Sequence, residues 1–253
     1  MPGERAVTEL LQAAPERVRE LWIERGREFP ALIELATNAG VAIRPRERDE
    51  LDDAVGPGLA RGVVAHARAP KAWAIEDLLE REEGPRTRRG FRLLVVLDGV
   101  QDPHNLGAVI RSAEFFGASG VVWARDRAAP LTPAAVRSSA GATERLPLCQ
   151  VTNLARALEQ AKQAQWWVIG TVVDDEPEDD EGEVAKRKPK IQTLHELGED
   201  PPSDMILVLG SEEKGLRRLT RERCDFLVTI EGAGELGSLN VSAAAAVALA
   251  QLG

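Results

Sequence analysis

Three short stretches gather the residue types that could do chemistry, and each follows an apolar run. They are DGVQDPHNLGAVIR at 98–111, GSEEKG at 210–215 and EGAGELGSLNVS at 231–242. Their amides, carboxylates, hydroxyls and guanidinium could bind and orient a polar substrate. Their glycines could let a ligand approach the backbone closely. No stretch has the spacing of a P-loop or of a GxGxxG dinucleotide fingerprint, so nucleotide binding of those kinds is disfavoured.

Each of these residues also has an ordinary structural interpretation. Asn105 and Asn240 stand just before expected helices, where an Asn side chain commonly caps the first turn. Glu212 could favour a helix N-terminus as a first-turn acid. Arg111 could be a surface arginine whose aliphatic stem covers apolar neighbours. His104 could act as a base, but a single loop histidine usually has no such role.

The elements that must position these residues alternate between strand and helix after Phe91. Continuous apolar runs, typical of buried parallel strands, cover 92–100, 120–124, 146–151, 166–173, 204–210 and 225–230. Helical segments are expected at 106–117, 132–141, 153–164, 216–224 and 240–252. This alternation predicts an α/β fold with a mostly parallel sheet covered on both faces. Ligands of such sheets bind outside the carboxyl ends of the strands, where the three polar stretches fall.

The N-terminal third reads as a separate small α/β unit. Helical spacing of apolar residues runs through 5–26, a helix and a strand follow over 30–46, and 60–67 predicts a further strand. A last helix is expected over 71–81. We therefore expect a domain at 1–82, a linker at 83–90 and a second domain at 91–253, with a charged insert at 174–190.

The linker is rich in charge, glycine and proline. Arg86, Arg88 and Arg89 could contact phosphates there, although a solvated linker is the favoured interpretation.

Composition places few limits on function. The 253 residues carry a net charge of −9, and the eight acids of DDEPEDDEGE at 174–183 account for all but about −1 of it. The charge therefore neither supports nor excludes RNA, and a basic face would have to be created by the fold. Cys149 and Cys224 have no metal-like spacing, which predicts a reducing cytoplasm. Neither a signal peptide nor a membrane span is expected.

Together, in this order, the stretches resemble one family. NLGAVIRSAEFFGASGVV, LVLGSEEKGLRRLTRERCDFLVTIEG and LGSLNVSAAAAVAL are similar to the three motifs of the SpoU (TrmH-type) RNA ribose 2′-O-methyltransferases. The resemblance covers about 91–253, and within the family it is to the bacterial 23S rRNA guanosine 2′-O-methyltransferases. The N-terminal unit resembles, less strongly, an L30e-like RNA-binding domain.

The resemblance implies a fold and a set of roles. The C-terminal part would be threaded as a deep trefoil knot, an exception to the rule against knots. S-adenosyl-L-methionine would sit in the knot, held mainly by the backbone of Gly210, Ile230 and Leu239. At Gly210, a side chain would take up the space of the ligand. The chain would form a homodimer through its final helix, with the site completed across the interface.

Arg111 would lie at the ribose hydroxyl, and Asn105 would orient either Arg111 or the ribose. Glu212 would hold either Arg111 or the cofactor end of the site. Ser238 and Asn240 would complete the polar wall. A guanidinium keeps its proton above pH 12, so stabilising the developing alkoxide suits Arg111 better than acting as a base.

Four functions remain open from the sequence. The first is 2′-O-methylation of 23S rRNA, favoured by the separate N-terminal unit and the lack of long basic extensions. The others are the same reaction on tRNA, methylation of an rRNA site that gives antibiotic resistance, and RNA binding without catalysis. The presence of all the polar site residues argues against the last.

Overall fold

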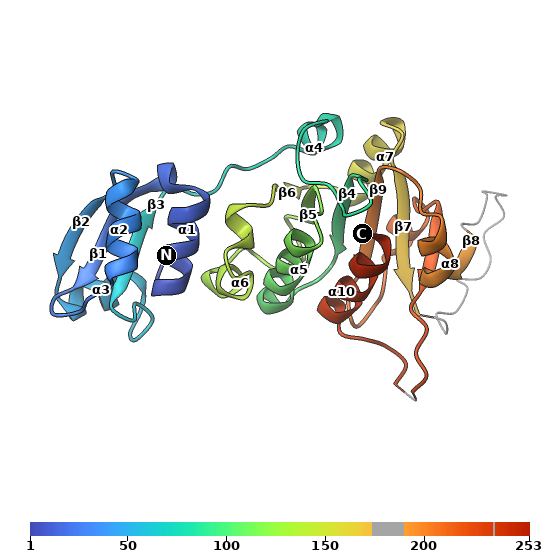
Figure 1. Ribbon diagram of the computed structural model, residues 1–253. Coiled ribbons are helices and arrows are strands. Elements are labelled where there is room, and N and C mark those ends of the chain that lie inside the picture. Colours follow the sequence, from blue (N-terminus) through green and yellow to red (C-terminus); the bar gives the residue numbers. More distant parts are fainter. Residues whose placement is uncertain (174–189, 235) are drawn as a thin grey trace.

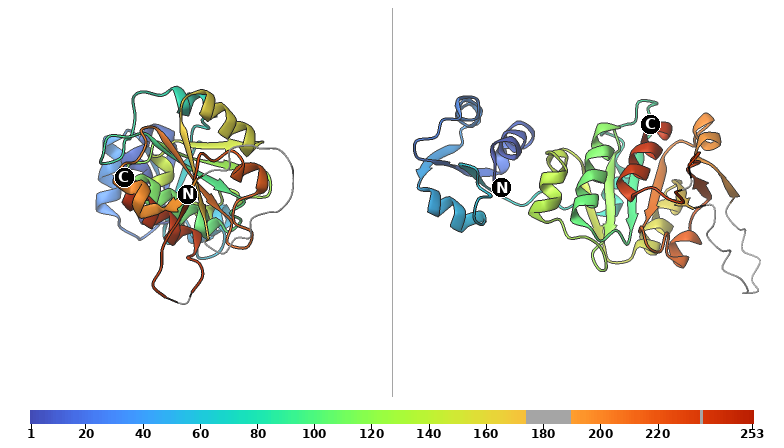
Figure 2. Two further views of the ribbon diagram at one scale, coloured as in Figure 1. Left: turned by 90° about the vertical axis from the view of Figure 1, so that its right-hand side faces the viewer. Right: turned by 90° about the horizontal axis from the view of Figure 1, so that it is seen from below.

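The computed structural model describes residues 1–173, 190–234 and 236–253. Within them the chain forms two α/β units, each built on its own sheet (Figure 1). The smaller unit holds the N-terminus, and the larger holds the C-terminus. They lie end to end, joined by the extended segment 68–74 (Figure 2).

The small unit is a three-stranded sheet with strand order β2-β1-β3. Strands β1 and β2 are parallel, whereas β3 is antiparallel to β1. Its elements are α1 (Glu4–Ala13), η1 (Pro15–Arg17), β1 (Val18–Glu24), α2 (Pro30–Asn38), β2 (Ala42–Arg46), α3 (Arg48–Val55) and β3 (Val63–Ala67).

The expected continuous helical pattern over 5–26 is wrong in its second half. Helix α1 ends at Ala13, Pro15 opens a 3-10 turn, and β1 follows. Proline lacks an N–H and cannot continue the helix. Val18, Leu21 and Trp22 have helical spacing in the sequence, but the strand buries Val18, Leu21 and Ile23 instead. Helix α3 was not predicted, because its only buried residue is Leu51.

The large unit is a seven-stranded sheet with strand order β6-β5-β4-β9-β7-β10-β8, and all its pairings are parallel. This confirms the expected α/β class. Its elements are α4 (Ile75–Glu80), β4 (Leu93–Asp98), α5 (Pro103–Phe115), β5 (Gly120–Ala124), α6 (Pro133–Ser138), η2 (Ala142–Glu144), β6 (Leu148–Val151), α7 (Leu154–Gln163), β7 (Trp167–Val172), β8 (Lys190–Thr193), α8 (Leu194–Glu199), β9 (Met205–Gly210), α9 (Arg218–Arg221), β10 (Phe226–Thr229) and α10 (Val241–Leu252).

The two faces of this sheet have separate cores. Helices α5, α6, α8 and α10 pack on one face, with Leu106, Ile110 and Leu249 among the buried residues. Helices α4, α7 and α9 lie on the other side, where Leu158 and Trp166 are buried. Strand β8 and helix α8 were not predicted, since they follow the charged insert directly. The insert itself lies outside the described residues, except for its last residue, which begins β8.

Helix α4 packs on the large sheet, although the expected boundary at 83–90 assigned it to the small unit. Ile75, Leu78 and Leu79 are buried in the same core as strand β4. The segment before it is also attached there, since the Trp73 N–H donates to the Leu148 carbonyl of β6. The small sheet thus ends about fifteen residues before the expected linker.

Two of the linker arginines bond to backbone carbonyls. Arg86 donates to the carbonyls of Glu82 and Gly90, and Arg89 donates to that of Gly198. None of the helices in the described ranges is long and apolar enough to cross a membrane.

Candidate functional site at the carboxyl ends of the strands

The three polar stretches meet at one edge of the large sheet. Strands β4 and β9 are neighbours, and their last residues, Asp98 and Gly210, pair in register. Helix α5 begins just after β4, and α10 packs beside it (Figure 1). Because all strands of this sheet are parallel, the loops after β4, β9 and β10 leave from the same edge.

A chain of side-chain hydrogen bonds joins the three stretches. The Asn105 Nδ2 donates to Glu212 Oε1 over 2.6 Å, and the Asn240 Nδ2 donates to Asn105 Oδ1 over 3.2 Å. The Asn240 Oδ1 accepts from both the backbone N–H and the hydroxyl of Ser242. Three of the expected site residues, which lie up to 135 residues apart, are therefore in direct contact.

Asn105 is free to make these bonds because it is not the helix cap. Helix α5 begins at Pro103, and the Asp102 side chain accepts the N–H of His104. The expectation that Asn105 precedes the helix is therefore wrong by one turn. Proline is well suited to the first helical position, and an aspartate before it completes the start signal. Asn105 then lies within the first turn and projects toward Glu212.

Asn240, in contrast, is both a cap and a member of the site. It precedes α10, and its side-chain oxygen accepts the N–H of Ser242, as expected for a cap. Its Nδ2 remains available for Asn105. Ser238 is exposed, and no hydrogen bond joins its hydroxyl to another described residue. The structure thus brings Asn240 into the cluster and leaves Ser238 outside it.

Gly210 is required by the chain itself. A Cβ on Gly210 would lie 2.3 Å from the Gly215 carbonyl carbon and 2.6 Å from the Leu216 nitrogen. Ser211 and Gly215 exchange two backbone hydrogen bonds, which fold the turn back onto the end of β9. The returning backbone takes up the space of a side chain at 210, which is a reason for glycine besides the expected one, and the turn presents Glu212.

Arg111 lies on another side of α5 from Asn105. It is exposed, and no hydrogen bond or ion pair links its guanidinium to the described residues. Of the expected alternatives, a contact of Arg111 with Asn105 or Glu212 is absent from this chain, since those two bind each other. At helical spacing Arg111 shares its face with Phe115, whose side chain is 78% exposed. Arg111 therefore faces outward beside an uncovered aromatic ring.

The loop between β10 and α10 offers free backbone groups. Ile230 is half-buried against the core, while Leu236 and Leu239 are 92% and 50% exposed. Among the described residues of 231–239, no backbone N–H or carbonyl bonds to another backbone group. Such a loop can offer both hydrogen bonds and apolar contacts to a ligand.

Asp98 and Arg217 were missed by sequence reasoning. The Asp98 carboxylate is buried, accepts the Arg217 backbone N–H over 2.8 Å, and pairs with the Arg217 Nε at 3.4 Å. Together they hold the far end of the turn that carries Glu212. A signal was present, because an aspartate ending a continuous apolar strand must find a buried partner.

Exposed arginines surround this edge of the large unit. Arg125 and Arg127 follow strand β5, Arg137 lies on α6, and Arg217 contacts the Arg127 carbonyl. None of the first three has a side-chain partner among the described residues. The fold thus gathers exposed arginines at this edge, beside the exposed acids Asp102, Asp126 and Glu213, an arrangement that composition alone could not reveal.

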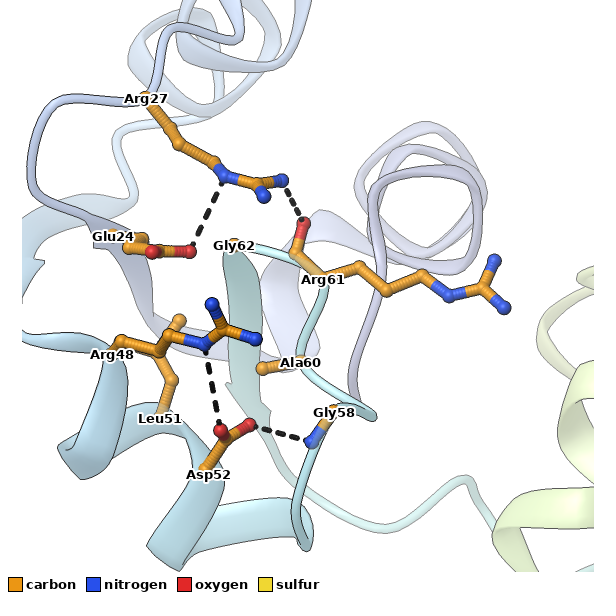
Figure 3. Close-up of a pocket in the computed structure, with 9 residues that line it drawn as sticks. All are labelled: Glu24, Arg27, Arg48, Leu51, Asp52, Gly58, Ala60, Arg61 and Gly62. Atoms are coloured by element: carbon orange, nitrogen blue, oxygen red, sulfur yellow. Dashed lines mark hydrogen bonds and ion pairs between the residues drawn. The ribbon is translucent and has the colours of Figure 1, made fainter.

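A pocket of about 320 Å³ lies elsewhere, in the small unit (Figure 3). Arg27 pairs with Glu24 at its mouth, and Arg48 pairs with Asp52. Arg61 directs its guanidinium away from the pocket (Figure 3). None of the predicted site residues lines it.

The cysteines are placed for packing. Burial raises the pKa of the Cys149 thiol to about 11 and that of Cys224 to about 12, so both stay protonated near neutral pH. In the described part of the chain, no cluster of three or more His, Cys, Asp or Glu residues could hold a metal ion.

The fold and the site define a two-unit α/β protein with a cluster of polar side chains at the carboxyl edge of a parallel sheet. Comparison with known proteins identifies it further. The SpoU rRNA Methylase family matches residues 92–250, and a family described as RNA 2′-O ribose methyltransferase substrate binding matches 2–73. The chain belongs to the SpoU rRNA methylase family, as the motifs predicted.

Its relatives match over nearly their whole length. The 23S rRNA (guanosine-2′-O-)-methyltransferase RlmB of Pseudomonas putida is 41% identical over 98% of this chain and 92% of its own. The protein of that name from Yersinia pestis is 40% identical over 98% and 93%. The SpoU methyltransferase AviRb from Streptomyces viridochromogenes, solved with the cofactor AdoMet, superposes with a TM-score of 0.74 at 26% identity. That alignment covers 100% of this chain and 88% of AviRb.

Proposed function

We propose that this protein transfers a methyl group from S-adenosyl-L-methionine to the ribose 2′-hydroxyl of a guanosine in 23S rRNA. The observation that carries the proposal is the Asn240–Asn105–Glu212 chain, which joins all three motifs at the carboxyl edge of the sheet. Two relatives named as 23S rRNA guanosine methyltransferases, about 40% identical and matched over 92% and 93% of their own length, support rRNA as the substrate.

The residues present fit the cofactor. Gly210 and the unpaired backbone of the described residues of 231–239 can offer carbonyls and N–H groups, and Ile230 and Leu239 an apolar wall. When bound, S-adenosyl-L-methionine supplies a methyl group on a positively charged sulfur. Because the cofactor would be held mainly by backbone groups, replacing the Arg111 side chain should leave cofactor binding largely intact.

Positioning is the main task of the polar residues. The ribose hydroxyl must be aligned with the bond that breaks, and alignment alone can contribute several kcal/mol. Asn105 and Asn240 fix the wall of the site, and Glu212 is held by Asn105. Arg111 stabilises the alkoxide as the hydroxyl loses its proton to the solvent, and Ser238 closes the open side when RNA is bound.

A second copy of the chain brings Arg111 to the site. Arg111 lies beside the exposed Phe115 on α5, and α10, which packs against α5, exposes Val247. This uncovered apolar face supports a homodimer through α5 and α10, with the site completed across it. Phe115→Glu is expected to yield a monomer in sedimentation. An unchanged dimer would contradict this interface.

The threading of the sheet supports the trefoil knot. Strand β10 lies between β7 and β8, although both precede it in the chain. The path from β10 to α10 then returns toward β4, past the turn after β9. A knotted segment would keep the three site loops together without a covalent link.

The small unit binds the RNA substrate. The substrate-binding family covers 2–73, so we place the domain boundary at the extended segment 68–74, with an L30e-like fold before it. Its sheet exposes arginines at one end, including Arg61, whose guanidinium has no partner among the described residues. The carboxyl ends of β1 and β2 point to the same side of the molecule as that of β7 (Figure 1). An rRNA substrate and two reduced cysteines support a cytoplasmic location.

The experiment is methyl transfer from tritiated S-adenosyl-L-methionine to 23S rRNA fragments and to tRNA, with mapping of the labelled nucleotide. We expect label on a guanosine ribose of 23S rRNA. Label only in tRNA would support the tRNA alternative, and label at a site that confers antibiotic resistance would support the resistance enzyme. No label in any RNA would overturn the proposal and favour an RNA-binding protein without catalysis.

A further inference from the structure

An arginine of the small unit bridges to the large unit. The Arg17 Nε and Nη2 both donate to the Arg68 carbonyl, over 3.2 and 2.8 Å, and Nη1 forms an ion pair with Glu144 of η2. Arg68 is the first residue of the extended segment that leaves the small sheet. One guanidinium thus contacts both Arg68, where the chain leaves the small sheet, and Glu144 of the large unit.

Its partner is a nearly buried carboxylate. The Glu144 side chain is 2% exposed, and that of Arg17 is 15% exposed. The Thr143 hydroxyl donates to Glu144 Oε1 over 3.3 Å, and the Ser139 hydroxyl lies 3.4 Å from that of Thr143. A carboxylate so far removed from water needs a cationic partner, and among the described residues Arg17 is the cation that pairs with it.

The segment that carries Glu144, helix α6 and η2 (residues 133–144), is also the platform against which α5 packs. A Cβ on Gly107 of α5 would lie 2.2 Å from the Ala135 carbonyl of α6, so the two helices touch backbone to backbone. The His104 Nδ1 lies 3.1 Å from the Ser138 hydroxyl. Helix α6 and η2, residues 133–144, therefore contact the small unit on one side and the N-terminus of α5 on the other.

Two further contacts restrict the joint. The Glu9 side chain of α1 covers Gly141, where a Cβ would lie 2.5 Å from Glu9 Oε2. Ala72 bridges Leu148 at the edge strand β6. A joint with three contacts of this kind holds the small unit in one orientation, whereas the extended segment alone would leave it free to swing.

We propose that the Arg17–Glu144 pair is a positioning device, which fixes the small unit against the platform that seats α5. This inference rests on the proposed function. RNA held by the small unit then reaches the site in one register, and the pair acts on how RNA is presented rather than on the transfer step. Neither residue touches the cofactor or the ribose.

The test compares Arg17→Met and Glu144→Gln in the full-length protein. We expect KM for a long 23S rRNA fragment to rise at least about tenfold, because RNA bound by a swinging unit is presented in many orientations. KM for a hairpin that carries the target nucleotide, but is too short to reach the small unit, should stay unchanged, as should S-adenosyl-L-methionine binding. Small-angle X-ray scattering should show a broader distribution of distances.

The matched control is Arg223→Met, which removes an ion pair with Glu159 within the large unit. It should leave both KM values and the scattering unchanged. Equal losses on the long and the short RNA, or unchanged KM for the long RNA, would overturn the inference. Glu144→Gln keeps the shape of the side chain, which makes the test independent of any folding defect of Arg17→Met.

The scattering also separates the two proposals. A wild-type protein that methylates no RNA would refute the proposed function. Scattering curves identical for the wild type and both variants would refute the positioning device.

Discussion

The side chain of Asn105 donates a hydrogen bond to Glu212 over 2.6 Å, although 107 residues separate them in the chain. One partner lies in the first turn of α5 and the other in the tight turn after β9. The bond therefore reports whether strands β4 and β9 are adjacent and whether both loops are correctly formed. It is the contact on which the assembly of the site depends most directly.

Replacing Asn105 by Asp should disable the site without unfolding the protein. Two carboxylates would then face each other at the position of the present bond, and Glu212 would turn away. We expect kcat to fall by about tenfold or more, while the melting temperature changes little because Glu212 is exposed. Asn153→Asp is the control, since Asn153 only caps α7 and aspartate caps equally well. Full activity of Asn105→Asp would refute the assigned role.

Arg111→Ala should abolish methyl transfer but leave cofactor binding within about twofold of wild type, because the arginine is expected to act on the developing alkoxide. The loss should exceed about a hundredfold. Isothermal titration of S-adenosyl-L-methionine and single-turnover rates measure the two effects separately. Arg88→Ala, a change of an exposed linker arginine, is the control. Loss of cofactor binding in Arg111→Ala would contradict the assignment.

Gly210→Ala tests the tight turn. The new methyl group would collide with the backbone of Gly215, so the turn that holds Glu212 must shift. We expect cofactor affinity to fall by about tenfold or more and the melting temperature to decrease. At Gly198 of α8, outside the proposed site, a Cβ would meet nothing closer than 3.4 Å. Gly198→Ala should therefore bind the cofactor normally, and equal effects of the two changes would argue against the steric explanation.

Asp204→Asn should destabilise the protein at neutral pH and much less in acid. Hydrogen bonds from Arg92, over 2.9 and 2.7 Å, lower the pKa of the Asp204 carboxyl below its ordinary value. This stabilisation is complete above the pKa of the unfolded state, near 4, and is lost as pH falls through the folded value. We expect a loss of about 1–3 kcal/mol at pH 7.

Asparagine also suits the left-handed backbone at this position, where φ is 49°. Urea unfolding at pH 7 and in acid well below pH 4, where folded Asp204 takes up its proton, measures the difference, with the exposed Asp126→Asn as control. A loss of the same size at both pH values would mean that the charge of Asp204 is not its cause.

Two truncations test the proposed domain boundary. Removing 1–70 should leave a folded, cofactor-binding large unit, because the truncation ends within the extended segment. Removing 1–85 also deletes Ile75, Leu78 and Leu79, whose burial contributes about 1.5–3 kcal/mol each. We expect this longer truncation to aggregate or to melt at a much lower temperature. Equal stability of the two proteins would restore the boundary at 83–90.

The sequence by itself determined the class of fold, the family and most of the site. Continuous apolar runs followed by periodic segments mark parallel strands and their helices, because burial on both faces leaves no alternation. The motifs named Asn105, Glu212 and Asn240, which the structure joins. Each of these features depends on a short stretch of sequence or on a motif, and it can therefore be predicted without the three-dimensional structure.

Only the tertiary structure decided how those residues are used. Whether Asn105 caps a helix or reaches Glu212 depends on where α5 begins, and Asp102 decides that. The need for glycine at 210 comes from Gly215, and the helix 75–80 joins the large unit through contacts with strand β4. The pair Arg17–Glu144 likewise exists only where two units meet. The physical reason is the same in each case, because packing between distant segments follows from strand order, which local periodicity does not encode.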